Sequence, residues 1–230
     1  MGLTRKFSQI LFRLLVWFFH LLYHQLAFLY DWVANIVSNG KWKHWIYEST
    51  NFVEEQPILE LGFGPGHLQK YLLEKGMSVF GLDESRYMSR LAMQRLRRST
   101  QVGIKMGLCR GIAQNLPFKN ETFSTIVATF PTTYIMDSAT IQECWRVLRP
   151  MGRFVILLGV RHGGNSLYER FLRWLFSITH QTIEDSDAEE FWKDHYTSSG
   201  FQVDQVWHPF EKDRLWFIVA EKRATPFAND

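Results

Sequence analysis

The sequence predicts an α/β domain built on a doubly wound, mostly parallel sheet, and three observations support this. Strand and helix signals alternate after Asn51, a glycine-rich turn at 60–66 joins a strand to a helix, and Asp83 follows the next strand. With 230 residues, 46% apolar and 21% charged, the chain has room for one domain of ordinary size plus an appendage.

The expected elements follow from hydrophobic period and from helix and turn signals. Strands are expected at 57–62, 78–82, 124–130 and 153–160, with a closing hairpin at 201–207 and 214–221. Helices are expected at 67–74, 86–98, 139–148 and 187–199, the third stopped by Pro150 and the fourth capped by Gly200. The hairpin implies one antiparallel strand near the edge of the sheet.

The amino-terminal segment differs in character from the rest. Residues 1–50 carry the whole net charge of +3, and residues 7–37 are apolar apart from a stripe of polar side chains at helical spacing: Gln9, Arg13, His20, His24, Asp31 and Asn35. This pattern favours a helix at a membrane surface, in contact through residues 5–37. A lid over the body and a transmembrane span stay open as alternatives. Nucleic acid is not an expected partner, because no broad basic face is present.

The turn from Glu60 to Gly66 reads Glu-Leu-Gly-Phe-Gly-Pro-Gly, at the place where open α/β sheets bind ligands. Its spacing excludes two common ligand sites. The dinucleotide fingerprint needs a third glycine where this chain has His67, which argues against a nucleotide-dependent oxidoreductase. A phosphate-binding P-loop needs Lys and Ser or Thr after the last glycine, and these are absent.

Asp83, with Glu84 beside it, follows the strand at 78–82. A carboxylate at the end of a second strand can accept hydrogen bonds from both hydroxyls of a ribose, and it would repel a phosphate. The alternative is a solvated turn acid or the N-cap of the helix at 86–98.

Together the turn and Asp83 resemble class I S-adenosylmethionine-dependent methyltransferases. The segments 111–118, 123–127 and 146–153 are similar to later motifs of that family, in the same order. The resemblance implies a seven-stranded Rossmann-like fold over residues 48–223, between an amino-terminal segment at 1–47 and a tail at 224–230. It implies S-adenosyl-L-methionine as cofactor, bound by Glu60, Gly62, Phe63, Gly64, Gly66, Asp83, Glu84, Ile112, Ala113 and Thr129. Ile112 stands where the family commonly has Asp, so adenine would rest on backbone groups and apolar packing.

The segment from Tyr30 to Trp45 is similar to the amino-terminal signature of the ubiquinone/menaquinone C-methyltransferase family. The resemblance implies a lipophilic small-molecule acceptor such as a quinol precursor, and a cytoplasmic protein at the inner face of the membrane. The family's Arg-Asn pair after the fourth strand is replaced here by residues of the stretch 130–134. Two alternatives remain: methylation of a phospholipid head group, and a catalytically silent protein that binds the cofactor.

The candidate catalytic residues are Tyr134, Asp137 and His162, which follow the strands at 124–130 and 153–160. A carbon or phenol acceptor needs a base, and these side chains are placed to provide one. Each also has a structural interpretation: Tyr134 as a residue at the core edge, Asp137 as a helix N-cap, and His162 as an exposed loop residue. No metal site is expected, because Cys and His do not cluster.

Overall fold

The computed structural model describes residues 32, 35–36, 38–97, 105–163 and 186–223. The polar stripe residues before Asn35 (Gln9, Arg13, His20, His24 and Asp31) and the tail at 224–230 lie outside these ranges. The strands are β1 (Ile58–Leu61), β2 (Val79–Asp83), β3 (Met106–Arg110), β4 (Phe123–Thr129), β5 (Leu148–Arg161), β6 (Phe201–Phe210) and β7 (Asp213–Lys222). The helices are α3 (Trp42–Glu48), α4 (His67–Glu74), α5 (Arg86–Leu96), α6 (Ser138–Val147) and α8 (Ser186–Thr197), with short 3-10 turns η1 (Ser49–Phe52) and η2 (Thr133–Met136).

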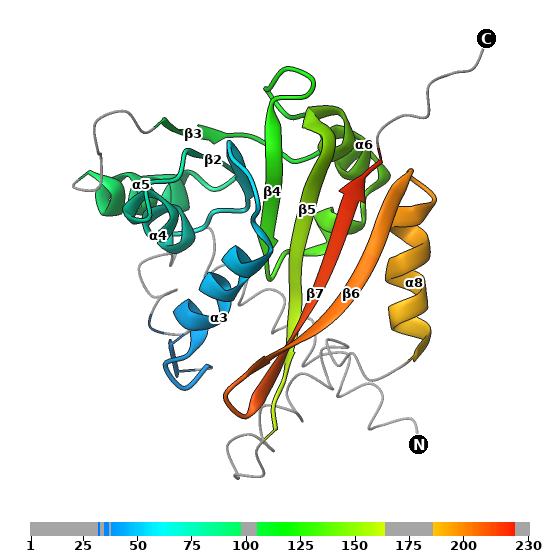
Figure 1. The fold of residues 1–230 in the computed structure, drawn as a ribbon. Coiled ribbons are helices and arrows are strands. Elements are labelled where there is room, and N and C mark those ends of the chain that lie inside the picture. The colour runs from blue at the N-terminus through cyan, green and yellow to red at the C-terminus, as the bar shows by residue number, and fades with distance from the viewer. Residues whose placement is uncertain (1–31, 33–34, 37, 98–104, 164–185, 224–230) are drawn as a thin grey trace, which may run out of the picture.

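The seven strands form one sheet in the order β3-β2-β1-β4-β5-β7-β6 (Figure 1). β1 to β5 pair in parallel, whereas β7 is antiparallel to both β5 and β6. The expected doubly wound sheet with one antiparallel strand near its edge is therefore confirmed. Because chain order reverses between β1 and β4, their carboxyl ends bound the place where such sheets bind ligands.

Apolar side chains on alternate strand positions build a core on each face of the sheet. On one face, Leu59, Ile126 and Ile156 pack with Ile141 of α6 and Tyr196 of α8. On the other, Ile58, Val127 and Val155 pack with side chains of α3, α4 and α5. The helices thus cover the two faces in two groups, α6 with α8 on one and α3 with α4 and α5 on the other (Figure 1).

Four strands differ from the expectation. β3 was not expected because Gly107 interrupts its apolar run and its residues are only half-buried or exposed. β5 begins at Leu148 rather than Arg153, since a register shift opposite Phe123 carries Pro150 into the strand. The hairpin strands are longer than expected and turn over two residues, Glu211 and Lys212.

The helix α3 is held against the body by apolar packing and by charge. Trp45 and Ile46 are buried in the second core with Leu215 and Phe217 of β7. At the start of α3, Lys41 Nζ lies 3.2 Å from Oδ2 of the buried Asp213 and 2.7 Å from the Glu211 carboxylate. α3 crosses the expected boundary between residues 47 and 48, and the division of the chain at that point stays a prediction.

Candidate functional site

The glycine-rich turn leaves β1 and returns as α4, and its glycines adopt positive φ angles: Gly62 +69°, Gly64 +50° and Gly66 +80°. Such angles strain other residues, which explains the glycines at these positions. A Cβ on Gly64 would meet nothing within 4 Å. The backbone of the turn is therefore open to close approach by a ligand at this point.

At Gly66, close packing against α5 also requires glycine. A Cβ there would lie 2.8 Å from Ala92 Cβ and 3.1 Å from Ala92 Cα of α5. The missing side chain therefore lets α4 begin directly against α5, which fixes where the turn ends.

We expect Gly66→Ala to lower the free energy of unfolding more than Gly76→Ala does. Gly76 has nearly the same φ, +79°, but nothing lies within 4 Å of its Cβ position. Gly76→Ala should therefore lose about 1 to 2 kcal/mol from the backbone alone, and Gly66→Ala about 1 to 3 kcal/mol more from the clash with α5. Urea unfolding of the two variants measures the difference, and equal losses would contradict this account.

Asp83 lies at the end of β2 and is 1% exposed. Its Oδ2 accepts a hydrogen bond from the Gly64 backbone N–H at 2.8 Å, and its Oδ1 accepts one from the Ser85 N–H at 2.8 Å. A carboxylate oxygen can accept more than one hydrogen bond, so this group is suited to receiving hydroxyl groups of a ligand as well. The hydrogen bond to Gly64 shows that the glycine-rich turn and Asp83, the two features singled out in the sequence, are in direct contact.

Glu60 is buried on β1 beside this carboxylate. Gln69 of α4 donates a hydrogen bond to Glu60 Oε2 at 2.9 Å and another to the Phe80 carbonyl at 3.1 Å. The pKa of Glu60 is raised to about 8, mainly because the carboxyl is buried; the hydrogen bond from Gln69 opposes the rise and the negative charge of Asp83 adds to it. In the free protein Glu60 is therefore largely protonated at neutral pH.

The loop after β3 begins at the same edge. The Gly111 N–H donates to the Asp83 carbonyl at 3.1 Å. Ala113 is buried in the same core as Leu61 and Leu82, whereas Ile112 is 52% exposed. Of this pair, only Ile112 presents an apolar side chain to the outside of the loop.

The other residues expected to bind the cofactor differ in how far their side chains are exposed. The Phe63 side chain is buried, and its Cδ1 lies 2.6 Å from the Cβ position of Gly81, so only its backbone is available to a ligand. Glu84 is exposed, and Thr129 is half-buried at the end of β4. Their roles in binding stay predictions.

Tyr134 is the candidate catalytic residue that lies against the glycine turn. Its hydroxyl donates to the Leu61 carbonyl at 3.3 Å and lies 3.0 Å from the Cβ position of Gly62. Burial raises the pKa of Tyr134 far above its ordinary value, and the negative charge of Asp83 adds to the rise. The phenol therefore stays protonated and is suited to donating a hydrogen bond rather than to acting as a base.

The structure does not bring the other two candidates to this point. Asp137 is the N-cap of α6: its Oδ1 accepts from the Ala139 N–H at 3.0 Å and its Oδ2 from Gln114 Nε2 at 3.1 Å. His162 follows β5, where its Nδ1 lies 3.3 Å from Asp213 Oδ1 and its ring packs 5.6 Å from that of Trp45. The geometry supports the structural interpretation of Asp137, and catalytic roles for both stay predictions.

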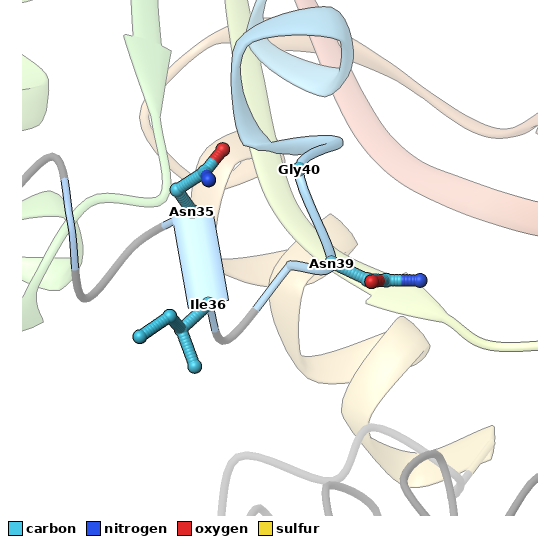
Figure 2. A pocket seen from close by; sticks show the side chains of 4 residues that line it. All are labelled: Asn35, Ile36, Asn39 and Gly40. Atoms are coloured by element: carbon cyan, nitrogen blue, oxygen red, sulfur yellow. The ribbon is translucent and has the colours of Figure 1, made fainter.

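A hollow of about 490 Å³ lies beside the segment that enters α3, lined by Asn35, Ile36, Asn39 and Gly40 (Figure 2). Two residues after Gly40, the Trp42 ring stacks on Phe130 at 4.4 Å between centroids. Phe130 directly follows Thr129 of β4. The start of α3 is therefore anchored at the carboxyl end of β4, on the same edge of the sheet as the glycine turn.

Two contributors to the site were missed by sequence reasoning. Gln69 is buried with its amide on Glu60, and a lone Gln on a helix gives no signal of such a partner. Ser85 was within reach, because its side chain accepts from the Met88 N–H as the N-cap of α5, a recognisable pattern.

Among the residues that the structure describes, no helix has the length and apolar character needed to cross a membrane. Over the same ranges, His, Cys, Asp and Glu form no group of three or more that could hold a metal ion.

Comparisons with known proteins agree with this geometry. Residues 59–156 match a family model described as a methyltransferase domain. A demethylmenaquinone methyltransferase of Lactiplantibacillus plantarum is 35% identical over 144 residues, which are 59% of this chain and 60% of the relative. The chain thus spans about three fifths of that relative's length.

Solved structures give the same result for the fold. A methyltransferase described as S-adenosylmethionine-dependent, from Methanosarcina mazei, is 26% identical over 75% of this chain and 95% of its own, with a TM-score of 0.52. A phosphoethanolamine N-methyltransferase of Haemonchus contortus, solved with S-adenosylmethionine, is 17% identical over 80% of this chain and 53% of its own, with a TM-score of 0.55.

These matches identify residues 59–156 as a domain of the class I S-adenosylmethionine-dependent methyltransferase type. Within that class, the chain resembles the methyltransferases of menaquinone biosynthesis. The cofactor of the class is S-adenosylmethionine. The residues present fit it, because the buried Asp83 offers acceptors for hydroxyl groups and the backbone at Gly64 is open to close approach.

Proposed function

We propose that this protein transfers the methyl group of S-adenosylmethionine to a lipophilic small molecule of the quinol-precursor class. The observation that carries the proposal is the contact between Asp83 and the open glycine turn at Gly64. The demethylmenaquinone methyltransferase similarity supports the choice of acceptor class.

The side chains have little bond chemistry to perform in this reaction. When bound, S-adenosylmethionine supplies a methyl group already activated on a sulfonium, so the protein's contribution is orientation and exclusion of water. We assign Tyr134 to positioning, as a neutral hydrogen-bond donor beside Gly62. The hollow beside Asn35 and Gly40 is the proposed approach for the acceptor, since the Trp42–Phe130 stack joins it to the carboxyl end of β4.

The test has two stages on the full chain in detergent. Titration calorimetry with S-adenosylmethionine and S-adenosylhomocysteine comes first, and binding in the micromolar range is expected. Incubation with a labelled methyl donor and a membrane lipid extract follows. Label in the apolar quinone fraction supports the proposal, and label in a phospholipid band supports head-group methylation instead. Binding without transfer of label would mean a catalytically silent cofactor-binding protein.

We further propose that the protein works at the inner face of the membrane, with residues 5–37 contacting the surface. Trp32 and Ile36 belong to this segment and are 65% and 47% exposed. Such large exposed apolar side chains are suited to the boundary between lipid head groups and acyl chains.

Replacing Trp32 and Ile36 together by Ser should weaken binding to vesicles of phosphatidylcholine and phosphatidylglycerol by roughly tenfold, because two apolar side chains no longer enter the lipid. Co-sedimentation of the full-length protein measures the effect. Met93→Ser on α5 is the matched control, since Met93 is also exposed but lies outside the segment. Equal sedimentation of the double variant and the wild type would refute contact through these side chains.

A further inference from the structure

Arg146, near the end of α6, uses all five of its guanidinium N–H groups. Nε and Nη2 donate to the two Glu143 carboxylate oxygens, each at 2.7 Å. Nη1 donates to the Phe118 carbonyl at 2.7 Å and to Asn120 Oδ1 at 2.9 Å, and Nη2 also donates to the Leu116 carbonyl at 2.9 Å. Such a fork, bidentate to a carboxylate, is a geometry that Lys cannot reproduce.

Glu143 completes the network from the other side. Its Oε2 also accepts a hydrogen bond from the Leu116 N–H at 2.7 Å, so the pair holds both polar backbone groups of Leu116. One turn and a half earlier on α6, the N-cap Asp137 holds the Gln114 side chain. Residues of α6 and its N-cap therefore form hydrogen bonds with the loop 111–120 at two places, Gln114 and the stretch 116–120.

The far end of this loop lies at the candidate cofactor site. The Gly111 N–H donates to the Asp83 carbonyl, and the Cβ position of Gly111 lies 3.2 Å from Leu82 Cδ1 on β2. Ala113 is buried in the same core as Leu61, the residue before the first glycine of the turn. Because the loop is fixed at Asp83 on one side and on α6 on the other, α6 sets where residues 111–113 stand beside the turn.

We propose that Arg146 and Glu143 are positioning residues for the cofactor: they dock the loop 111–120 on α6 and so hold one wall of the cofactor site in its binding geometry. A wall that is already ordered spares the ligand the entropy of ordering it, which raises affinity. The inference rests on the cofactor lying at the Asp83 edge. It does not depend on which acceptor is methylated.

Arg146→Gln is expected to weaken S-adenosylhomocysteine binding about tenfold. The packing of Phe118 on Phe123, at 4.9 Å between ring centroids, keeps the loop attached while its polar anchor is lost. Amide hydrogen exchange should accelerate in the peptide covering 111–120 and stay unchanged in β1 and β4. Saturating S-adenosylhomocysteine should restore part of the protection. Arg146→Lys should give an intermediate affinity, because an ammonium reaches a carbonyl but does not form the fork.

Arg149→Gln is the matched control. Arg149 lies three residues further on and donates to the Glu121 carbonyl and to Ser124 Oγ, at the amino end of β4. Its loss should leave S-adenosylhomocysteine affinity within twofold of wild type. If Arg146→Gln unfolds more easily but binds as well as Arg149→Gln, the network serves stability alone and the proposal is wrong.

Should Arg146→Gln fail to fold, Glu143→Gln replaces it. That variant keeps an acceptor for the Leu116 N–H but loses the charge that pairs with Arg146. Unchanged affinity in this variant also contradicts the proposal. An Asp83 variant with normal affinity would instead show that the cofactor site lies elsewhere, so the two failures are distinguishable.

Discussion

Replacing Asp83 with Ala should lower the affinity for S-adenosylhomocysteine by about 10- to 100-fold. The substitution removes the proposed acceptor for ribose hydroxyls, and it also leaves the buried Gly64 N–H without its partner at 2.8 Å. Both effects act on the same turn, so the loss should exceed that of one exposed hydrogen bond. Titration calorimetry measures it, together with a thermal melt to verify folding.

Two further variants separate the causes. Asp83→Asn keeps the shape and one acceptor oxygen but removes the charge, so its affinity should fall between those of wild type and the Ala variant. Asp204→Ala, at an exposed position on β6, controls for loss of a carboxylate elsewhere. A folded Asp83→Ala protein that binds like wild type would place the cofactor away from this turn.

Replacing Glu60 with Gln is expected to stabilise the free protein by a few kcal/mol at pH 8 and by little at pH 5. The Glu60 pKa is about 8 in the folded protein, against an ordinary value of 4.5, because the carboxyl is buried. Gln is neutral at every pH and its amide oxygen can still accept from Gln69, so it keeps the contact without the buried charge.

The sign follows from proton binding. Between pH 4.5 and 8 the folded protein retains a proton on Glu60 that the unfolded chain has released. Rising pH therefore lowers the free energy of unfolding across this window, and the effect levels off above it. The Gln variant lacks this slope, so its advantage grows from pH 5 to pH 8.

Urea unfolding at pH 5, 6.5 and 8 measures the effect. Glu74→Gln is the control, since Glu74 is exposed on α4, where it pairs with Lys70 at 2.9 Å. Parallel pH curves for the Glu60→Gln and wild-type proteins would contradict the raised pKa. A stabilised variant that binds S-adenosylmethionine more weakly would mean that Glu60 is retained for the ligand at the expense of the fold.

The parts of the fold that the sequence predicts best are those with local signals. The bounds of α4 are as expected, because Gly66 fixes its start and Leu68, Leu72 and Leu73 repeat at helical spacing. β3 has no such signal, since it is half-buried and contains Gly107. Helix was expected within residues 1–47, but the bounds of α3 could not be predicted, because it is held mainly by Trp45 and Ile46 packing on strands far along the chain.

The site divides in the same way. The glycine turn and Asp83 could be predicted because residue type and spacing are enough to recognise them. The contacts of Arg146 depend on where the carbonyls of Leu116 and Phe118 point, and residue type carries no information on that. The place of His162 could not be predicted either, since it depends on the register of β5: Leu157 pairs with Thr129, the last residue of β4, and β5 then continues to Arg161.

The pairing of Lys41 with Asp213 has a consequence for synthesis on the ribosome. The two residues are 172 positions apart, and Leu215 and Phe217, which cover α3, follow directly. At about 5 to 20 residues per second, roughly 10 to 30 s pass between their addition to the growing chain. During that interval α3 lacks the partners that β7 provides. Trp45, which shares its core with Leu215 and Phe217, is then available to chaperones or to a nearby lipid surface until β7 has been added.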